Sequence, residues 1–335
     1  MTKKPFVCLA ALSLLLVLSI AVSVALGRYA ISFSELLGIL RQQFLQGEVY
    51  WSDIQQSLLL YHRLPRVLAA CLVGGCLATA GASYQSVFQN PMAAPDILGA
   101  SSGAALGAAL AIFFDLGNTG IILLAFFFSL ATVTAVILIA GLTKGKRTLS
   151  LVLSGIMMSS LVSSCTSFIK LVADPEDQLP AITYWLMGSL NGIAPDDLFF
   201  ALFPMLAGLV PLLVLRWRIN LLTLGDQEAL ALGVNAHRLR ILVILCSTLI
   251  TAASVSISGM IGWVGLVIPH LARRITGSDY RYLLPASTLL GAVFLLWVDN
   301  ISRNLLATEI PIGILFSFLG APFFLYLITR GGERL

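Results

Sequence analysis

The sequence is poor in charged residues. Only 11% of its 335 residues are Asp, Glu, Lys or Arg, whereas 58% are hydrophobic and the mean hydropathy is +0.95. A chain of this length has too little polar side-chain surface to cover a water-soluble globule. The composition therefore predicts a protein that uses lipid as its solvent. The net charge of +4 does not indicate nucleic-acid binding, because the basic residues are scattered through short loops.

Cysteine and histidine are scarce as well, with five and three residues. The cysteines fall in apolar runs and none forms a CxxC pair, so we interpret them as small core residues and expect no disulfide framework. They are Cys8, Cys71, Cys76, Cys165 and Cys246. The histidines, His62, His237 and His270, are far apart in sequence, so we expect no metal site.

The sequence also lacks the common catalytic motifs. It contains no GxxxxGK[ST] loop for nucleotide phosphates and no recognisable nucleophile with its base. We therefore expect that the chain is not an enzyme, that it binds no cofactor, and that any ATP hydrolysis takes place on another protein.

The apolar residues are grouped into ten runs, several of them shorter than the roughly 20 residues of a full membrane span. This pattern predicts an all-α integral membrane protein with about ten transmembrane helices. The runs are Pro5–Leu26, Val67–Phe88, Ile97–Phe114, Gly120–Leu142, Leu149–Ile169, Leu198–Leu215, Ile241–Ser258, Ile261–Leu271, Leu283–Val298 and Ile310–Ile328. We expect the eighth run to continue through Pro269 toward Gly277.

The distribution of basic residues predicts how the chain is oriented in the membrane. If both termini are cytoplasmic, 14 of the 20 Lys and Arg residues lie on the inner side, as the positive-inside bias requires. The remaining six are then at or near the outer face: Arg28, Arg41, Arg63, Arg66, Lys170 and Arg303. The first run is longer than the 7–15 apolar residues of a signal peptide, so we interpret it as the first span. Residues 1–335 are interpreted as one transmembrane domain, with an outer segment on the membrane from Gly27 to His62.

A short polar interruption separates two apolar runs between Thr223 and Arg240. Asp226 is a residue type that caps helix N-termini, and Gly233 is one that ends helices. The four flanking arginines, Arg216, Arg218, Arg238 and Arg240, favour the cytoplasmic side. The pattern predicts a small cytoplasmic helix that a motor subunit could hold, with an ordinary amphipathic loop as the alternative.

Small residues cluster where helices must pack closely. They occupy Gly74–Gly81 and Leu98–Leu110, and they predict close helix packing inside the bilayer. Between these stretches, Pro91 and Pro95 predict a break in the helix at the inner end of the second span. Such a break could form part of a gate.

Several motifs, in this order and over nearly the whole chain, resemble those of the FecCD family, the membrane permeases of type II ABC importers for iron-siderophores, haem and cobalamin. The motifs are RLPR at Arg63–Arg66, GxxLAxxG and NPxAxPxxLG within Gly74–Gly99, YWLMGSL at Tyr184–Leu190, LGxxxAxxLGV at Leu224–Val234, GWVGLVIPHLAR at Gly262–Arg273 and the stretch from Glu309 to Phe323 that begins ExPIG.

The resemblance implies a ten-helix permease with both termini inside, which works as a dimer in the inner membrane of a bacterium. It implies as partners a pair of cytosolic ATPases that bind ATP and Mg, a periplasmic binding protein and a second permease subunit. The small cytoplasmic helix then matches the coupling helix that contacts the ATPase. Its residues are Gly225, Asp226, Gln227, Glu228, Ala229, Leu230, Leu232, Gly233 and Val234.

Two further sites follow from the resemblance. Three outer arginines, Arg63, Arg66 and Arg303, match those that pair with acidic residues of the binding protein, and the alternative is that they brace helix ends, with Arg303 paired to Asp299. The family's cytoplasmic gate matches two pairs of residues in this chain. The second pair departs from the two small polar residues of the family, because Leu149 is bulky and apolar. The gate residues are Asn90, Met92, Thr148 and Leu149.

The family resemblance favours an iron(III)-siderophore as cargo and leaves haem, cobalamin and molybdate open. An ion-coupled secondary transporter is the alternative from another class, but its ionisable residues should lie near the bilayer midplane, whereas those of this chain cluster at the ends of the runs. A membrane-embedded enzyme would need convergent catalytic groups, which the three separated histidines do not supply.

Overall fold

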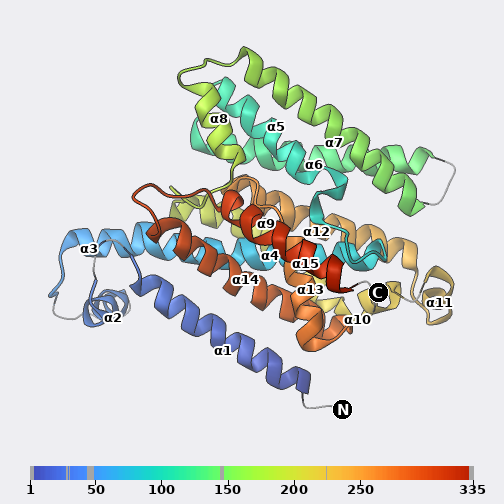
Figure 1. The fold of residues 1–335 in the computed structure, drawn as a ribbon, viewed down its shortest axis with the longest axis horizontal. Helices are drawn as coiled ribbons and strands as arrows, with labels where there is room; N and C mark the ends of the chain where they lie inside the picture. The colour runs from blue at the N-terminus through green and yellow to red at the C-terminus, as the bar shows by residue number, and fades with distance from the viewer. Residues whose placement is uncertain are drawn as a thin grey trace.

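The computed structural model describes residues 4–27, 29, 31–43, 49–143, 147–223 and 225–331, and within these ranges it contains helices and loops but no strand. Each of the ten predicted apolar runs forms a helix (Figure 1). These helices are α1 Lys4–Ala25, α4 Leu64–Val87, α5 Ala100–Phe113, α6 Gly117–Leu142, α7 Arg147–Val172, α9 Pro195–Val214, α12 Ala236–Ser258, α13 Val264–Thr276, α14 Tyr280–Asn304 and α15 Ile312–Gly331.

Shorter helices connect them. They are α2 Phe33–Gln42, α3 Asp53–Ser57, the π-helix η1 Leu58–Arg63, the 3₁₀ helix η2 Pro95–Leu98, α8 Gln178–Leu186, α10 Arg216–Leu222 and α11 Asp226–Ala231. Five of the short helices lie in stretches where the sequence pattern predicted no helix: α2, α3, η1, α8 and α10. Helix α2 begins in a capping box, because the Ser32 hydroxyl accepts the Glu35 amide and the Glu35 carboxylate accepts the Ser32 amide.

Seven helical segments are long and apolar enough to cross a membrane, by length and composition. Two of the ten helices are shorter than the roughly 20 residues of a full span. Helix α5 has 14 residues, because η2 and the left-handed Gly99 precede it, and α13 has 13. Helix α13 does continue through Pro269 and ends at Gly277, which has a φ of +83°, as the sequence predicted.

Helix α4 lies at the centre of the bundle. The apolar window of its span is 83% buried, compared with 22% for α7. Helix α4 packs against α12, α13 and α14, while α5, α6, α7 and α8 form a group on one side that α12 joins to the rest (Figure 1).

The two ends of the bundle are distinct. Helix α11 and the first turn of α1 lie at one end, and α2 and α3 lie at the other (Figure 1). This arrangement agrees with the predicted orientation, in which α11 is cytoplasmic. Five of the basic residues used for that prediction, Lys3, Arg28, Lys144, Lys146 and Arg334, lie outside the described residues.

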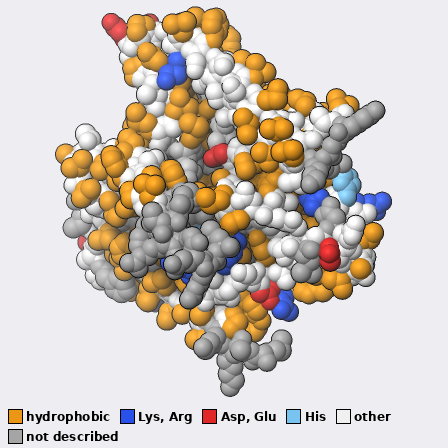
Figure 2. Space-filling view, turned by 45° about the vertical axis from the view of Figure 1, so that its right-hand side comes forward, with side chains coloured by type: hydrophobic (Ala, Val, Ile, Leu, Met, Phe, Trp, Pro, Cys, Tyr) orange, Lys and Arg blue, Asp and Glu red, His pale blue; other side chains and the backbone are white. Residues whose placement is uncertain are grey.

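The outer surface of the bundle is largely apolar. Hydrophobic side chains cover much of the face in Figure 2, and charged side chains are few. Large apolar side chains point away from the protein on several helices, including Leu142, Leu171, Phe199 and Phe203, which are 84%, 80%, 78% and 79% exposed. Because such a surface would be unfavourable in water, it agrees with the predicted lipid environment.

The predicted small-residue stretches are sites of close helix contact. A β-carbon on Gly81 would lie 1.8 Å from the carbonyl oxygen of Gly265, and one on Gly107 would lie 2.2 Å from that of Leu124. Only glycine permits α4 to approach α13, and α5 to approach α6, at these points.

One prediction about the cysteines is wrong. Cys76 and Cys246 are buried and Cys8 and Cys71 are partly buried, but Cys165 is exposed on the outer side of α7. An apolar run in a membrane protein does not distinguish core positions from lipid-facing ones, because both environments are apolar. The five cysteines are free thiols.

Candidate functional sites at the two ends of the bundle

The predicted outer arginines come together where α4 begins and α14 ends. Arg63 is the last residue of the π-helix η1, and Arg66 lies one turn later, in α4. Pro65 cannot donate the hydrogen bond that would continue a regular helix ladder, and a π turn accommodates this irregularity directly before it. Arg303 reaches the same region from the last turn of α14.

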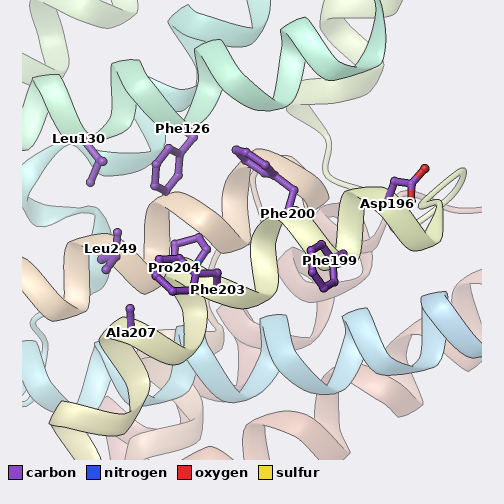
Figure 3. Close-up of a pocket in the computed structure, with 9 residues that line it drawn as sticks. All are labelled: Phe126, Leu130, Asp196, Phe199, Phe200, Phe203, Pro204, Ala207 and Leu249. Carbon is purple, nitrogen blue, oxygen red and sulfur yellow. The ribbon is translucent and has the colours of Figure 1, made fainter.

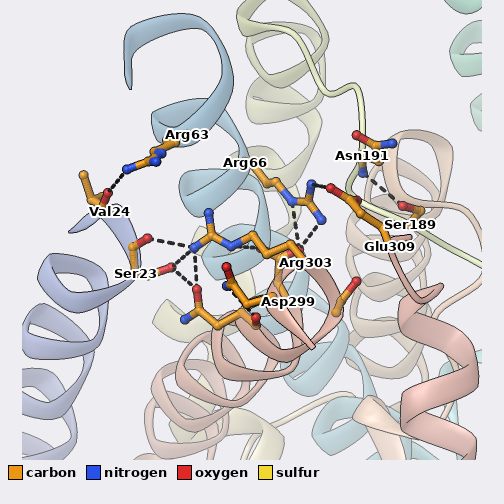
Figure 4. A network of polar contacts seen from close by, with 12 residues as sticks. Ser23, Val24, Arg63, Arg66, Ser189, Asn191, Asp299, Arg303 and Glu309 are labelled. Atoms are coloured by element: carbon orange, nitrogen blue, oxygen red, sulfur yellow. Dashed lines mark hydrogen bonds and ion pairs between the residues drawn. The ribbon is translucent and has the colours of Figure 1, made fainter. Parts of the chain in front are cut away.

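Arg66 is the centre of a buried ion-pair cluster (Figure 4). Its Nε and Nη2 atoms both lie 2.9 Å from Oδ1 of Asp299, which is fully buried. Its Nη1 donates to Oε1 of Glu309 at 2.9 Å, and Glu309 lies in the loop before α15. Arg303 Nε lies 3.7 Å from Oδ2 of Asp299. The Asp299 carboxylate therefore pairs with the guanidinium groups of both Arg66 and Arg303.

The other arginine contacts tie the first helix to this cluster. Arg303 Nη2 donates to the carbonyl oxygen of Ser23 at 2.7 Å and also to the side chain of Asn300. Arg63 Nη1 donates to the carbonyl oxygen of Val24 at 3.3 Å. The last carbonyl groups of an α-helix have no partner inside the helix. In α1, two of these carbonyl groups accept hydrogen bonds from arginine side chains instead.

The arginine cluster borders a cavity of about 300 Å³ at this end of the bundle. Its polar lining includes Tyr29, His62, Asn191, Asn304 and Glu309 together with the three arginines. Three guanidinium groups face two carboxylates, Asp299 and Glu309, so the cluster carries an excess of one positive charge when all five groups are ionised. The structure thus places the three arginines as braces between helix ends, the alternative that the sequence left open, and docking of a partner stays a prediction.

Sequence motifs that are distant along the chain meet beside this cavity. The amides of Ile312 and Gly313 donate to the carbonyl oxygens of Gly188 and Met187, which joins the ExPIG stretch to the YWLMGSL stretch. The amide of Ser189 donates to the carbonyl oxygen of Ser258 at the end of α12. The loop that carries Glu309 is therefore connected by backbone hydrogen bonds to α8 and α12.

At the opposite end, the predicted cytoplasmic helix is present as α11. Asp226 is its first residue and not its N-cap, because Gly225 with a φ of +116° occupies the cap position. The helix ends as predicted at Gly233: the Gly233 amide donates to Leu230 O and the Val234 amide to Ala229 O, which is a Schellman motif. Leu224 lies outside the described residues.

Helix α11 presents an apolar surface away from the bundle. Leu230 and Leu232 are 66% and 58% exposed, whereas Ala229 is fully buried. A cavity of about 430 Å³ lies beside the helix, bordered by Trp217 and Arg238 among others. Arg240, one of the four arginines that flank this segment, is buried in α12.

The predicted gate residues lie on two separate elements. Asn90 and Met92 occupy the turn after α4, where Asn90 Oδ1 accepts the Met92 amide at 2.9 Å, and Met92 is 45% exposed. Thr148 and Leu149 lie in the first turn of α7, and Leu149 is 57% exposed. In the described part of the chain, no hydrogen bond joins the two pairs. Their role as a gate stays a prediction.

Sequence reasoning missed the part that Glu309 plays. The signal was present, because Glu309 is an ionisable residue inside a motif at the outer end of a run, where such residues usually have a defined partner. Asp299 was considered only as a partner of Arg303, whereas its closer partner in the structure is Arg66.

Comparisons with known proteins agree with this architecture. Residues 15–330 match the model of the FecCD transport family. The chain is 41% identical over 324 residues to the molybdate import system permease protein MolB of Haemophilus influenzae, covering 96% of each chain. It is 35% identical over 339 residues to the Fe(3+)-citrate import system permease protein YfmE of Bacillus subtilis, covering 97% of this chain and 96% of the relative.

Among solved structures, the chain resembles a metal-chelate type ABC transporter in an inward-facing conformation. The identity is 40%, the TM-score is 0.86, and the match covers 96% of this chain and 98% of the other. The ten apolar helices, the two distinct ends and the family match lead to one conclusion: the chain belongs to the FecCD transport family and is a membrane-spanning permease of the ABC transporter class.

Proposed function

We propose that this chain is the permease subunit of an ATP-driven importer that moves an iron(III)-siderophore or a similar metal chelate into the bacterial cytoplasm across the inner membrane. The observation that carries the proposal is the presence of different contact surfaces at the two ends of one bundle. The outer end has a cavity with three arginines, and the inner end has a protruding helix with exposed leucines.

The inner end suits contact with a cytosolic ATPase. Leu230 and Leu232 would become buried on binding, and burial of a leucine side chain stabilises a complex by roughly 1.5–3 kcal/mol. Gly225 and Gly233, which have positive φ angles, fix both ends of α11, so the helix can transmit a push from the partner to α10 and α12. The ATPase, and not this chain, would bind ATP and Mg.

The outer end suits contact with an acidic side chain of a periplasmic binding protein. The cavity is bordered by three largely buried guanidinium groups, which exceed the two carboxylates beside them. A partner carboxylate that enters the cavity would find donors already held in place, and such charge complementarity increases the rate and specificity of encounter. A second permease subunit would complete the translocation path between the two copies.

The cargo is proposed from similarity. The relatives' names include an oxyanion and a ferric chelate, and the related structure is of the metal-chelate type. Haem, cobalamin and molybdate are the alternative cargoes. The deciding experiment reconstitutes the permease with its ATPase and binding protein in vesicles and compares uptake of each cargo with ATP or with an ion gradient. Uptake driven by the gradient without ATPase would contradict the proposal.

The inner contact has a separate test. Leu230→Asp changes a largely exposed residue, so we expect a folded permease that no longer copurifies with the ATPase. The matched control is Ile54→Asp, since Ile54 is 67% exposed at the opposite end of the bundle. Equal ATPase recovery from both variants would remove α11 from the proposed interface.

The outer contact is tested with Arg63→Gln, which keeps an amide donor for α1 but removes the positive charge. We expect weaker docking of the binding protein and a smaller dependence of affinity on salt, because the variant removes one charge from an attraction that salt screens. Thermal unfolding of the same variant separates loss of docking from loss of structure. Unchanged affinity at low and high salt would leave Arg63 with a bracing role alone.

A further inference from the structure

A groove runs between α6 and α9 (Figure 3). Its volume is about 610 Å³, which is within the roughly 300–1,000 Å³ of small-molecule sites. Both helices pack against α12, and Leu249 of α12 lies between them. Phe126 and Leu130 of α6 face Phe200 and Pro204 of α9 across the groove.

The sequence of α9 explains why the groove stays open. Pro204 and Ala207 place short side chains on the groove face, where larger residues would fill it. Phe126 and Phe200 meet edge to face at 6.4 Å between ring centroids and hold the two helices apart at that level. Phe199 and Phe203 stand at the border and are 78% and 79% exposed, so their faces are available to a ligand.

The length and polarity of the groove match one lipid chain. From Asp196 to Ala207 the groove follows twelve residues of α9, whose eleven rises of 1.5 Å give about 16 Å. This length is about half of the roughly 30 Å hydrocarbon core. The lining is apolar except at its end, where Asp196 in the first turn of α9 marks the membrane surface. The groove thus spans a single leaflet, on the outer side in the predicted orientation.

The negative charge at the Asp196 end of the groove determines which kind of lipid headgroup can bind there. Asp197 already has partners within the protein, because its carboxylate accepts hydrogen bonds from Asn118 and from the Ala194 amide. Asp196 is exposed, and in the described part of the chain it has no hydrogen bond or ion pair. Two adjacent carboxylates at a lipid-facing groove repel a headgroup of net negative charge and attract the ammonium of a zwitterionic one.

We propose that the groove between α6 and α9 binds one acyl chain of a phospholipid whose headgroup carries a primary ammonium, and that this ammonium pairs with Asp196. The site requires only that the helices lie in a membrane, so it is independent of the cargo and of the ATPase. A lipid held there would support α9 at the level where Pro204 interrupts its hydrogen-bond ladder.

The test is native mass spectrometry of the full-length permease with added phosphatidylethanolamine or phosphatidylglycerol of identical acyl chains. We expect phosphatidylethanolamine to be retained preferentially. Asp196→Asn should lower this preference roughly five-fold, because an exposed ion pair contributes up to about 1 kcal/mol. Ala207→Leu fills the groove and should reduce retention of phosphatidylethanolamine at least about ten-fold.

The matched control is Val210→Leu, which adds bulk to an exposed position of α9 outside the groove lining and should leave retention unchanged. Equal retention of the two lipids by the unmodified protein would overturn the headgroup assignment. Unchanged retention in Ala207→Leu would overturn the site. A disulfide-linked dimer formed by Phe203→Cys in a Cys165→Ser background would identify a second copy of the chain as the occupant and would also overturn the proposal.

Discussion

The Arg66 guanidinium and the Asp299 carboxylate form a buried pair, with two nitrogen atoms of Arg66 each 2.9 Å from one Asp299 oxygen. The residues are 233 positions apart in the chain and join α4 to α14. A buried pair of this kind is weak evidence for added stability, since both charges lose hydration. Removal of one partner, however, leaves the other charge buried without compensation.

The first prediction concerns the loss of one partner from this buried pair. Asp299→Ala should destabilise the fold by about 3–5 kcal/mol, because Arg66 and Arg303 lose their shared carboxylate. Glu309→Gln is the control: its side chain is 25% exposed and keeps an oxygen acceptor for Arg66, so we expect a loss of no more than about 1 kcal/mol. Thermal unfolding in detergent measures both, and equal midpoints for the two variants would contradict the assignment.

The second prediction concerns helix contact. Gly81→Ala would place a β-carbon 1.8 Å from a backbone oxygen of α13 that cannot move aside alone, so we expect a loss of roughly 1–3 kcal/mol. Gly141→Ala in α6 has no neighbour within 4 Å and should instead stabilise the protein by up to about 1 kcal/mol. The signs of the two changes in unfolding midpoint should be opposite.

The third prediction concerns the end of α11. Gly233 has a φ of +79°, and Gly233→Ala would strain the Schellman motif by roughly 1–2 kcal/mol although no atom lies within 4 Å. Hydrogen–deuterium exchange of the α11 amides should accelerate about 5–30-fold. Gly233→Asn should change exchange much less, because asparagine tolerates a left-handed conformation. Identical exchange in both variants would show that the motif does not limit opening of α11.

The fourth prediction concerns pH at the N-terminal end of α14. Asp279 caps this helix and accepts a hydrogen bond from Arg281 Nε at 2.8 Å, which lowers the pKa of the Asp279 carboxyl below its ordinary 3.8. The stabilisation is complete above the unfolded-state value and is lost as pH falls through the lowered folded-state pKa.

Unfolding midpoints should therefore show no Asp279-dependent difference between pH 7 and pH 5. Below about pH 3.8 the unmodified protein should lose up to about 1 kcal/mol relative to Asp279→Asn, since asparagine also caps helices but does not titrate. A constant difference between the two proteins down to pH 2 would contradict the role of this ion pair.

Much of the fold could be predicted from local patterns. The ten apolar runs gave the ten helices, and Gly233 and Gly277 ended α11 and α13 as expected. The proline pair also broke the chain after α4 as expected. These features depend on a few neighbouring residues, so one segment is enough to specify them.

Other features could not be predicted in this way. The exposure of Cys165 depends on which face of α7 meets the bundle, and lipid and protein interior favour the same side chains. Asp226 is the first residue of α11, and Gly225 is its N-cap. The preference of aspartate for N-cap positions did not predict this, because the backbone conformation of Gly225 decides where the helix begins. The place of Glu309 beside Arg66 required the loop between α14 and α15 to fold back against α4.

By itself the sequence determined that this protein lies in lipid, which segments become helices, and the family to which it belongs, because hydropathy and motifs are carried by contiguous residues. Only the tertiary structure decided that Arg66 and Arg303 share the buried Asp299 carboxylate and that Arg303 reaches Ser23 in α1, 280 positions away in the chain. It also decided that α6 and α9 leave a groove. Such pairings arise from the packing of helices around α4, where close contacts and satisfied charges select one arrangement from many.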